Sequence, residues 1–209
     1  MENTKVKILD ILYEYIGEFE TGKIYTIAAR PGMGKTVFAT NIYKELAGTA
    51  RYIKTELSHF IEIVSQYKGI NISETLDIDR LEYIVRTAPE NIIIIDDFNF
   101  INKYNYDGAK RIEKMATKYQ KVIIVLTSIS RRREFKRDKR PKRCDLIRKY
   151  CHTLKKRSEV IIFLFREKYY SASGSENLEI YIHKKGSGYK YFSIDFIELL
   201  KAVKSKKQD

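Results

Sequence analysis

The chain has 209 residues, 44% hydrophobic and 32% charged, with a formal net charge of +13 and a pI near 9.5. This mix is typical of a globular protein, and the length fits one domain over residues 1–209. No apolar run approaches the roughly 20 residues needed to cross a bilayer, so we expect no membrane partner. The start, MENTKVKILD, lacks an apolar signal region and predicts a cytoplasmic protein. The charge favours an anionic partner, nucleic acid before membrane.

The N-terminal part of the chain predicts a helix, a strand and a second helix. Residues 4–17 carry apolar side chains at helical spacing, so an N-terminal helix is expected within residues 1–18. Residues 22–29, GKIYTIAA, form a short β-rich run. Residues 35–48 follow as a helix with a glycine at the C-terminal end.

The middle of the chain alternates strands and helices. The predicted strands are 51–56, 91–100 and 121–128. The predicted helices are 57–69, 75–88 and 107–120. The run NIIIIDDFNF contains four consecutive isoleucines, the pattern of a strand buried on both faces of a parallel sheet.

The C-terminal third predicts a strand at 159–167 and a β-hairpin of residues 177–185 and 189–196 around two glycines. Strand–helix alternation followed by a hairpin indicates an α/β fold. We therefore expect a mainly parallel central sheet flanked by helices, with a C-terminal β-hairpin.

The strand at 22–29 runs into AARPGMGKT, which fits the P-loop pattern G-x-x-x-x-G-K-[ST] except at Ala29. A P-loop wraps phosphates with backbone N–H groups and the positive end of the following helix. Lys35 is placed to reach the β- and γ-phosphates of ATP, and the Thr36 hydroxyl to bind Mg²⁺. The residues expected to contact the nucleotide are Ala29, Arg30, Pro31, Gly32, Met33, Gly34, Lys35 and Thr36.

Carboxylates follow two of the predicted strands. Asp96 is the first after the isoleucine run and is expected to hold Mg²⁺. Asp97 is the adjacent alternative, or a strand-end carboxylate without chemistry, because alternate side chains point to opposite faces. Glu56 stands at the carboxyl end of its strand, where open α/β sheets bind ligands, and is a candidate catalytic base or a surface carboxylate.

These residues together resemble the ATPase domain of DnaB-type replicative DNA helicases, in the RecA-like group. The family's Ala-Ala-Arg-Pro-Ser-Met-Gly-Lys-Thr matches residues 28–36 at eight of nine positions. Its Ser-Leu-Glu-Met resembles KTELS and implies Glu56 as the catalytic glutamate, and its Val-Ile-Asp-Tyr-Leu-Gln resembles IIIDDFN and implies Asp96 as the magnesium ligand. Residues 127–146 resemble its Ser-Gln-Leu-Asn-Arg and Asp-Lys-Arg-Pro stretches. The resemblance implies a RecA-like P-loop NTPase that binds ATP and Mg²⁺ and assembles as a hexameric ring.

The sequence departs from the family's pattern at three places. Ser128 stands where the family has a glutamine that relays the nucleotide state, and its shorter side chain cannot make the same γ-phosphate contact. Lys184 and Lys185 fall where the family donates a Lys and an Arg finger to the neighbouring subunit, and lysine lacks the planar fork. An arginine finger is worth about 10³–10⁵ in rate, so hydrolysis is expected to be slow. In the family, an N-terminal domain and a linker helix precede the ATPase core. We expect the helix at 4–17 either to substitute for that linker helix or to cap the core of its own chain.

A strongly basic segment, residues 131–157, has fourteen Lys and Arg residues against three acidic ones. In the family, loops here face the ring channel and follow single-stranded DNA; the alternative is a solvated loop. Phosphate contacts predict binding that falls steeply with salt. Only Phe135 and Tyr150 interleave with the cations, which predicts little base stacking. The predicted DNA-binding residues are Arg131, Arg132, Arg133, Arg140, Arg143, Arg148 and Lys149.

Two functions follow from these patterns. Lys35, Thr36, Asp96 and Glu56 favour an ATPase that acts on single-stranded DNA in replication as an assembling motor. Ser128 and the absence of an arginine in the hairpin favour a nucleotide-gated DNA-binding protein, or an accessory to a helicase or replication partner, with little hydrolysis.

Overall fold

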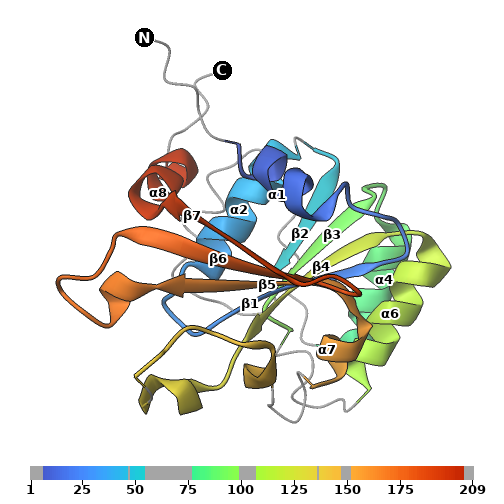
Figure 1. Ribbon diagram of the computed structural model, residues 1–209. Coiled ribbons are helices and arrows are strands. Elements are labelled where there is room, and N and C mark those ends of the chain that lie inside the picture. The colour runs from blue at the N-terminus through green and yellow to red at the C-terminus, as the bar shows by residue number, and fades with distance from the viewer. Residues whose placement is uncertain are drawn as a thin grey trace.

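The computed structural model describes residues 7–46, 48–54, 77–98, 107–135, 137–146 and 152–204. Seven strands form one sheet in the order β2-β3-β4-β1-β5-β6-β7 (Figure 1). The strands are β1 (Ile24–Ala29), β2 (Ala50–Lys54), β3 (Ile92–Asp96), β4 (Val122–Ser128), β5 (Ser158–Arg166), β6 (Asn177–Lys184) and β7 (Tyr189–Asp195). The first five in spatial order are parallel, and β6 and β7 pair antiparallel to their neighbours. The predicted α/β fold with a mainly parallel sheet and a hairpin is confirmed.

Helices connect the strands and cover the sheet. They are α1 (Ile8–Ile16), α2 (Lys35–Glu45), α4 (Ile78–Thr87), α6 (Gly108–Tyr119), α7 (His152–Arg157) and α8 (Phe196–Lys204). Short 3₁₀ turns occur at η1 (Arg131–Phe135), η2 (Arg143–Asp145) and η3 (Glu167–Tyr169). The predicted helix at 57–69 lies outside the described residues. Within the described ranges given above, no helix combines the length and hydrophobicity needed to span a membrane.

Both faces of the sheet are buried, which is why its central strands are continuously apolar. On one face, α1, α2 and α8 pack over side chains such as Ile27 and Ile94. On the other, α4 and α6 pack over their strand neighbours, among them Ile93 and Ile123 (Figure 1). Alternating side chains of each strand thus feed two separate hydrophobic clusters.

The helix α1 packs on the core of its own chain. Its buried residues are Ile8, Leu9, Leu12 and Ile16. The carboxylate of Glu45 on α2 accepts the N–H groups of Ile8 (2.9 Å) and Leu9 (2.7 Å), and Lys184 Nζ donates to the Ile16 carbonyl (2.8 Å). Both ends of the helix are therefore capped by side chains from elsewhere in the fold. Burial raises the pKa of Glu45, against the lowering effect of these N–H groups.

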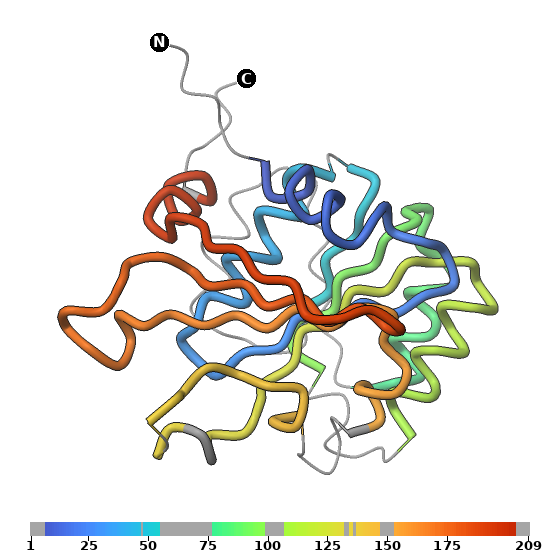
Figure 2. The backbone as a smooth tube through the Cα atoms, viewed as in Figure 1, coloured from blue at the N-terminus to red at the C-terminus, as the bar shows by residue number. Residues whose placement is uncertain are grey.

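The segment after β4 crosses the outer part of the second face. Ile129 and Leu146, at its two ends, pack against Ala28 of β1 and Ile161 and Phe163 of β5. In Figure 2 the tube for these residues, in yellow and gold, runs beside the strands of the C-terminal hairpin. Topology thus places the first half of the basic segment next to a hairpin that follows it by some forty residues of chain.

Two helices were not predicted. α7 forms inside the basic segment. The one apolar side chain of this helix, Leu154, is fully buried. α8 follows the hairpin directly, and its buried residues Phe196, Leu199 and Val203 have helical spacing. The predicted hairpin extended to Phe196, and no helix was predicted after it.

Candidate functional site

Residues 29–36 form the loop between β1 and α2. Ala29 is the last residue of β1 and pairs with Ser128 of β4, and it keeps a negative φ. The alanine in place of the first P-loop glycine is therefore an ordinary strand residue. Gly32 (φ 80°) and Gly34 (φ 92°) have left-handed backbones, and Gly34 is the N-cap of α2. The loop turns where glycine permits it and delivers the chain to a helix N-terminus.

Two aromatic side chains press on these glycines. A Cβ at Gly32 would lie 2.7 Å from Tyr169 Cε2, and one at Gly34 would lie 2.6 Å from Phe196 Cε2. Real Cβ atoms do not approach so closely, so a side chain at either position would force the ring to shift, and both backbones favour glycine. The unpredicted helix α8 thus buttresses the loop through its first residue, Phe196.

The structure brings Lys35, Thr36 and Asp96 together at the carboxyl end of the parallel strands. Thr36 Oγ1 donates to Asp96 Oδ2 at 2.9 Å. Lys35 Nζ donates to Ser128 Oγ at 3.2 Å and to the Ala29 carbonyl at 3.4 Å. Burial lowers the pKa of Lys35, and the carboxylates of Asp97 and Asp96 oppose this. A hydroxyl and a carboxylate oxygen side by side are donors that suit Mg²⁺, so the residues present fit that ion.

Sequence reasoning missed two partners of Asp96. Tyr52 OH donates to Asp96 Oδ2 at 2.8 Å, and Lys54 Nζ lies 3.4 Å from the same oxygen. Both come from β2, and Lys54 is only 4% exposed. Burial, and then the charge of Asp96, raise the pKa of Tyr52 well above its usual value. The signal in the sequence was weak, because Lys54 ends a short strand that also contains Arg51. Its burial implies a partner, since charged residues are rarely buried without one.

Asp97 and Ser128 also belong to this site. Ser128 Oγ donates to Asp97 Oδ2 at 3.2 Å while it accepts from Lys35. The serine that replaces the family's glutamine therefore bridges the loop lysine and the second carboxylate of the strand end. We predicted that the Asp97 side chain points to the other face of the strand. Its hydrogen bond with Ser128 keeps it within this site.

The remaining predicted catalytic and finger residues are placed as follows. Glu56 lies outside the described residues, two positions after the end of β2 at Lys54. Lys184 is engaged within its own chain by the Ile16 carbonyl, and Lys185 is exposed at the hairpin turn. Of these two finger candidates, Lys185 has the more accessible side chain.

Arg30 joins the loop to the basic segment. It is 1% exposed, and its Nη1 donates to the Lys139 carbonyl (2.7 Å) and to Tyr170 OH (3.3 Å). Its Nε lies 3.9 Å from Glu134 Oε1. Its Nη2 is buried and has no hydrogen-bond partner in the described part of the chain. Buried N–H donors without acceptors lower the free energy of unfolding. Arg30 therefore joins two loops while it reduces the stability of the fold.

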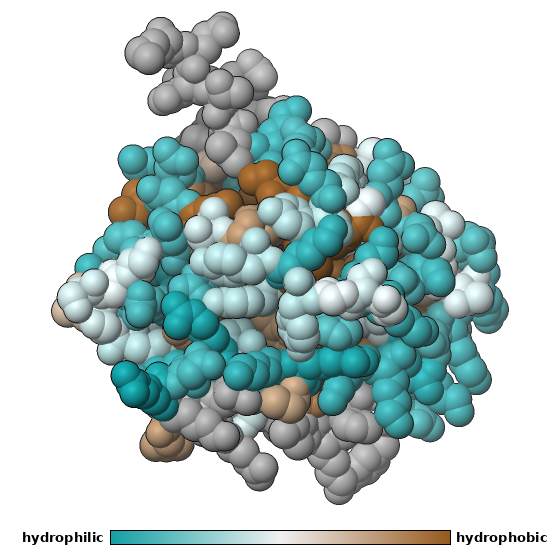
Figure 3. Space-filling model, in the orientation of Figure 1, coloured by the Kyte–Doolittle hydropathy of each residue, from teal (hydrophilic) through white to brown (hydrophobic). Residues whose placement is uncertain are grey.

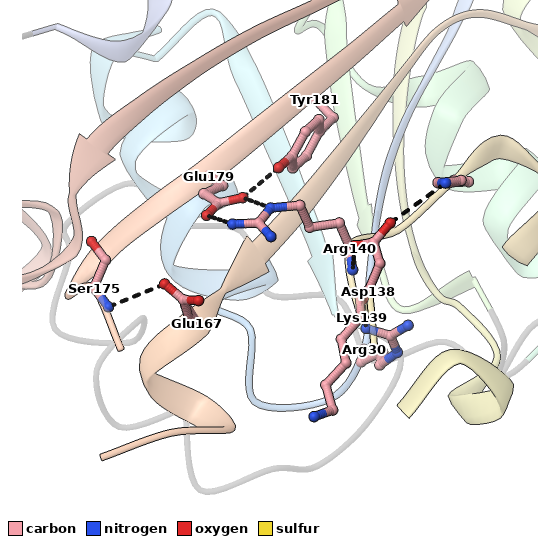
Figure 4. Close-up of polar contacts among 9 residues, drawn as sticks. Arg30, Asp138, Lys139, Arg140, Glu167, Ser175, Glu179 and Tyr181 are labelled. Carbon is pink, nitrogen blue, oxygen red and sulfur yellow. Dashed lines mark hydrogen bonds and ion pairs between the residues drawn. The ribbon is translucent and has the colours of Figure 1, made fainter. Parts of the chain in front are cut away.

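The predicted DNA-binding arginines differ in their surroundings. Arg131 is exposed. Arg140 forms a two-pronged ion pair with Glu179 of β6 (2.8 and 2.9 Å), and Tyr181 donates to the same carboxylate (Figure 4). Arg143 Nη2 donates to the Lys155 carbonyl (3.3 Å). Arg132 and Arg133 belong to η1, but their side chains lie outside the description, as do Arg148 and Lys149 entirely.

This fold, a parallel sheet whose first strand leads through a glycine loop into a helix, with a carboxylate on the neighbouring strand, is that of a RecA-like ATPase domain. Residues 51–204 match the model of the DnaB-like helicase C terminal domain. The chain belongs to this family. The loop at 29–36 precedes the matched residues.

Similar proteins agree with this assignment. A "Probable plasmid replicative DNA helicase" of Chlamydia psittaci is 26% identical over 220 aligned positions, covering 80% of this chain and 48% of that protein. The chain thus spans about half the length of this relative. A solved structure of an ATPase domain superposes with a TM-score of 0.80 at 20% identity, covering 96% of this chain and 89% of that one. A DnaB-like replicative helicase, solved in a study of its interactions with primase, gives a TM-score of 0.76 at 20% identity, covering 92% and 59%.

Proposed function

We propose that this chain binds ATP with Mg²⁺ on residues 29–36 and Asp96 and hydrolyses it while acting on single-stranded DNA, as part of a replicative helicase. The observation that carries the proposal is the convergence of Lys35, Thr36 and Asp96, with Thr36 Oγ1 only 2.9 Å from Asp96 Oδ2. The family membership supports the helicase class. Glu56, just beyond β2, is the residue we assign to activation of water.

Each residue has a defined task in this account. The backbone of the loop and the N-terminus of α2 bind the phosphates, and Lys35 leaves Ser128 to neutralise them. Thr36 and Asp96 would hold Mg²⁺, which would supply positive charge against the phosphates. Lys54, buried beside Asp96, adds a fixed positive charge at the same edge of the sheet.

The contacts of Arg30 support a link between nucleotide and DNA. Arg30 belongs to the nucleotide loop, and its Nη1 donates to the carbonyl of Lys139 in the basic segment. A shift of the loop on ATP binding would therefore move the backbone between η1 and η2. We propose that the basic segment contacts the phosphates of single-stranded DNA and senses the nucleotide in this way.

A second function has its own support. Ser128 is short and already engaged between Lys35 and Asp97. If Ser128 contacts the γ-phosphate only weakly, the chain would bind nucleotide and DNA but hydrolyse little ATP. It would then act as an accessory protein. Assembly as a ring, and a partner such as the primase named with one structural neighbour, are proposals that rest on the family alone.

Removing the exposed cations Arg131 and Arg137 by alanine substitution should weaken binding of single-stranded DNA of every sequence. Each lost phosphate contact should reduce the slope of log K against log salt by about 0.7. Fluorescence anisotropy of a labelled oligonucleotide between low and high salt measures both quantities. The matched control replaces Lys110 and Lys114, two exposed cations on α6. Equal slopes in all three proteins would contradict a role of the basic segment in phosphate binding.

A further inference from the structure

The C-terminal hairpin carries a row of aromatic rings on the face that the basic segment borders. Register pairs Tyr181 with Tyr191 and His183 with Tyr189, so all four side chains lie on one face of β6 and β7. We call these four residues the tyrosine face. The opposite face of the same strands is apolar and packs under α1 and α8, as shown by Ile180 and Ile182.

Two of these rings are exposed. Tyr189 is 56% and Tyr191 53% exposed, although tyrosine carries a large apolar surface. Each is backed by a ring of β6: the Tyr181–Tyr191 centroids are 5.0 Å apart, and the His183–Tyr189 centroids 4.9 Å. The backing contacts hold the exposed rings in place, so a flat ligand would meet a preformed surface.

Cations surround this face. The backbone N–H of Arg143 donates to Tyr189 OH (3.3 Å), which fixes η2 against the end of β7. Arg143 Nη2 donates to the Lys155 carbonyl (3.3 Å), which places these two residues next to each other. Burial lowers the pKa of His183, and the charges of Arg143 and Lys155 lower it further. Among the described residues, neither Arg143 nor Lys155 forms an ion pair with a carboxylate. No carboxylate of the described residues therefore neutralises these two charges.

The spacing of the rings favours a single strand. Residues two apart on a strand lie roughly 6.8 Å apart, because the rise is about 3.4 Å per residue. Stacked nucleotides are about 3.4 Å apart, so bases must separate to use both rings. Hydrophilic and weakly polar residues cover most of the face of the molecule seen in Figure 3.

We propose that Tyr189 and Tyr191 form a base-stacking site for single-stranded nucleic acid, with Arg143 and Lys155 beside it for the phosphates. This deepens the proposed function, on which it rests, because it adds base contacts to a segment expected to bind phosphates alone. Stacking on aromatic rings is tolerant of sequence, as a translocating or non-specific binder requires.

The test compares a thymidine oligonucleotide with an abasic oligonucleotide of the same length, using the full chain. The wild type should bind the thymidine strand more tightly, because the abasic strand keeps the phosphates and lacks the bases. Tyr189→Ala with Tyr191→Ala should weaken thymidine binding by about 5- to 100-fold for each ring and leave abasic binding within about twofold. The salt slope should not change. Tyr191→Phe, which keeps the ring and leaves the Tyr189 hydroxyl in place, should bind as the wild type does.

The control is Tyr83→Ala, an exposed tyrosine (59%) on α4 that also has an arginine, Arg86, over its ring. Equal binding of both oligonucleotides by the wild type would overturn the stacking site and leave DNA binding by the basic segment intact. Binding of neither would overturn both. If the double alanine variant alters only the sedimentation of the protein, the tyrosine face is a contact between copies of this chain and the proposal is wrong.

Discussion

Replacing Asp96 by alanine is expected to lower the stability of the nucleotide-free protein by about 3–5 kcal/mol, because it strands a buried charge. Lys54 is 4% exposed and has its ammonium 3.4 Å from Asp96 Oδ2. Tyr52 OH, donating to the same oxygen, would also lose its acceptor. At about 2–4 °C per kcal/mol for a chain of this size, the melting temperature should fall by roughly 6–20 °C.

A double-mutant cycle makes this prediction specific. Lys54→Met in the Asp96→Ala background removes the stranded charge and should restore most of the lost stability, so the two changes are not additive. The control is Asp79→Ala, which removes a 73% exposed partner of Arg111 and should cost no more than about 1 kcal/mol. Thermal unfolding without nucleotide measures Asp96→Ala, Lys54→Met, the double variant and Asp79→Ala. A loss for Asp96→Ala no greater than for Asp79→Ala would contradict the buried pair.

Replacing Gly34 by alanine is expected to destabilise the protein and to abolish tight nucleotide binding. Its φ of 92° costs an L-residue about 1–2 kcal/mol, and the new Cβ would meet Phe196 Cε2 at 2.6 Å. Phe196 has little room to move, because the Arg166 guanidinium lies 3.6 Å from its ring centroid. Overpacking should add about 1–3 kcal/mol, and relief of the clash would displace the N-terminus of α2, which we expect to bind the phosphates.

Gly186→Ala separates the two costs. Gly186 has a φ of 76°, but no atom lies within 4 Å of its added Cβ, so this variant bears the backbone strain alone. The melting temperature of Gly34→Ala should lie roughly 2–12 °C below that of Gly186→Ala. Titration with a fluorescent ATP analogue should show binding by Gly186→Ala and its loss in Gly34→Ala. Equal melting temperatures would show that α8 does not buttress the loop.

The sequence predicted the parallel sheet well because its strands are buried on both faces and their apolar runs are local signals. The isoleucine run became β3, and the loop AARPGMGKT fell between β1 and α2 as expected. α8 was missed because the predicted hairpin extended to Phe196, which is the first residue of this helix. Length and charge patterns alone do not reveal an anchor such as Leu154 of α7.

The partners within the site were harder to predict than its members. Lys54 contacts Asp96 because β2 and β3 pair in parallel with these two residues opposite each other. The sequence of one strand does not determine its register with another. Ser128 meets Lys35 for a similar reason, through the pairing of β4 with β1. The tyrosines beside the basic segment belong to a hairpin much later in the chain. The aromatic residues within the segment therefore gave no indication of them.

We infer that the site built by Lys35, Thr36 and Asp96 hydrolyses ATP in response to DNA. The most direct test measures ATP turnover against protein concentration, with and without single-stranded DNA, for the wild type, Lys35→Ala and Glu56→Gln. We predict turnover that DNA stimulates, that rises more than linearly with protein concentration and that vanishes in both variants. Wild-type turnover equal to that of Glu56→Gln, while ATP is still bound, would contradict the motor and leave a nucleotide-gated binding protein.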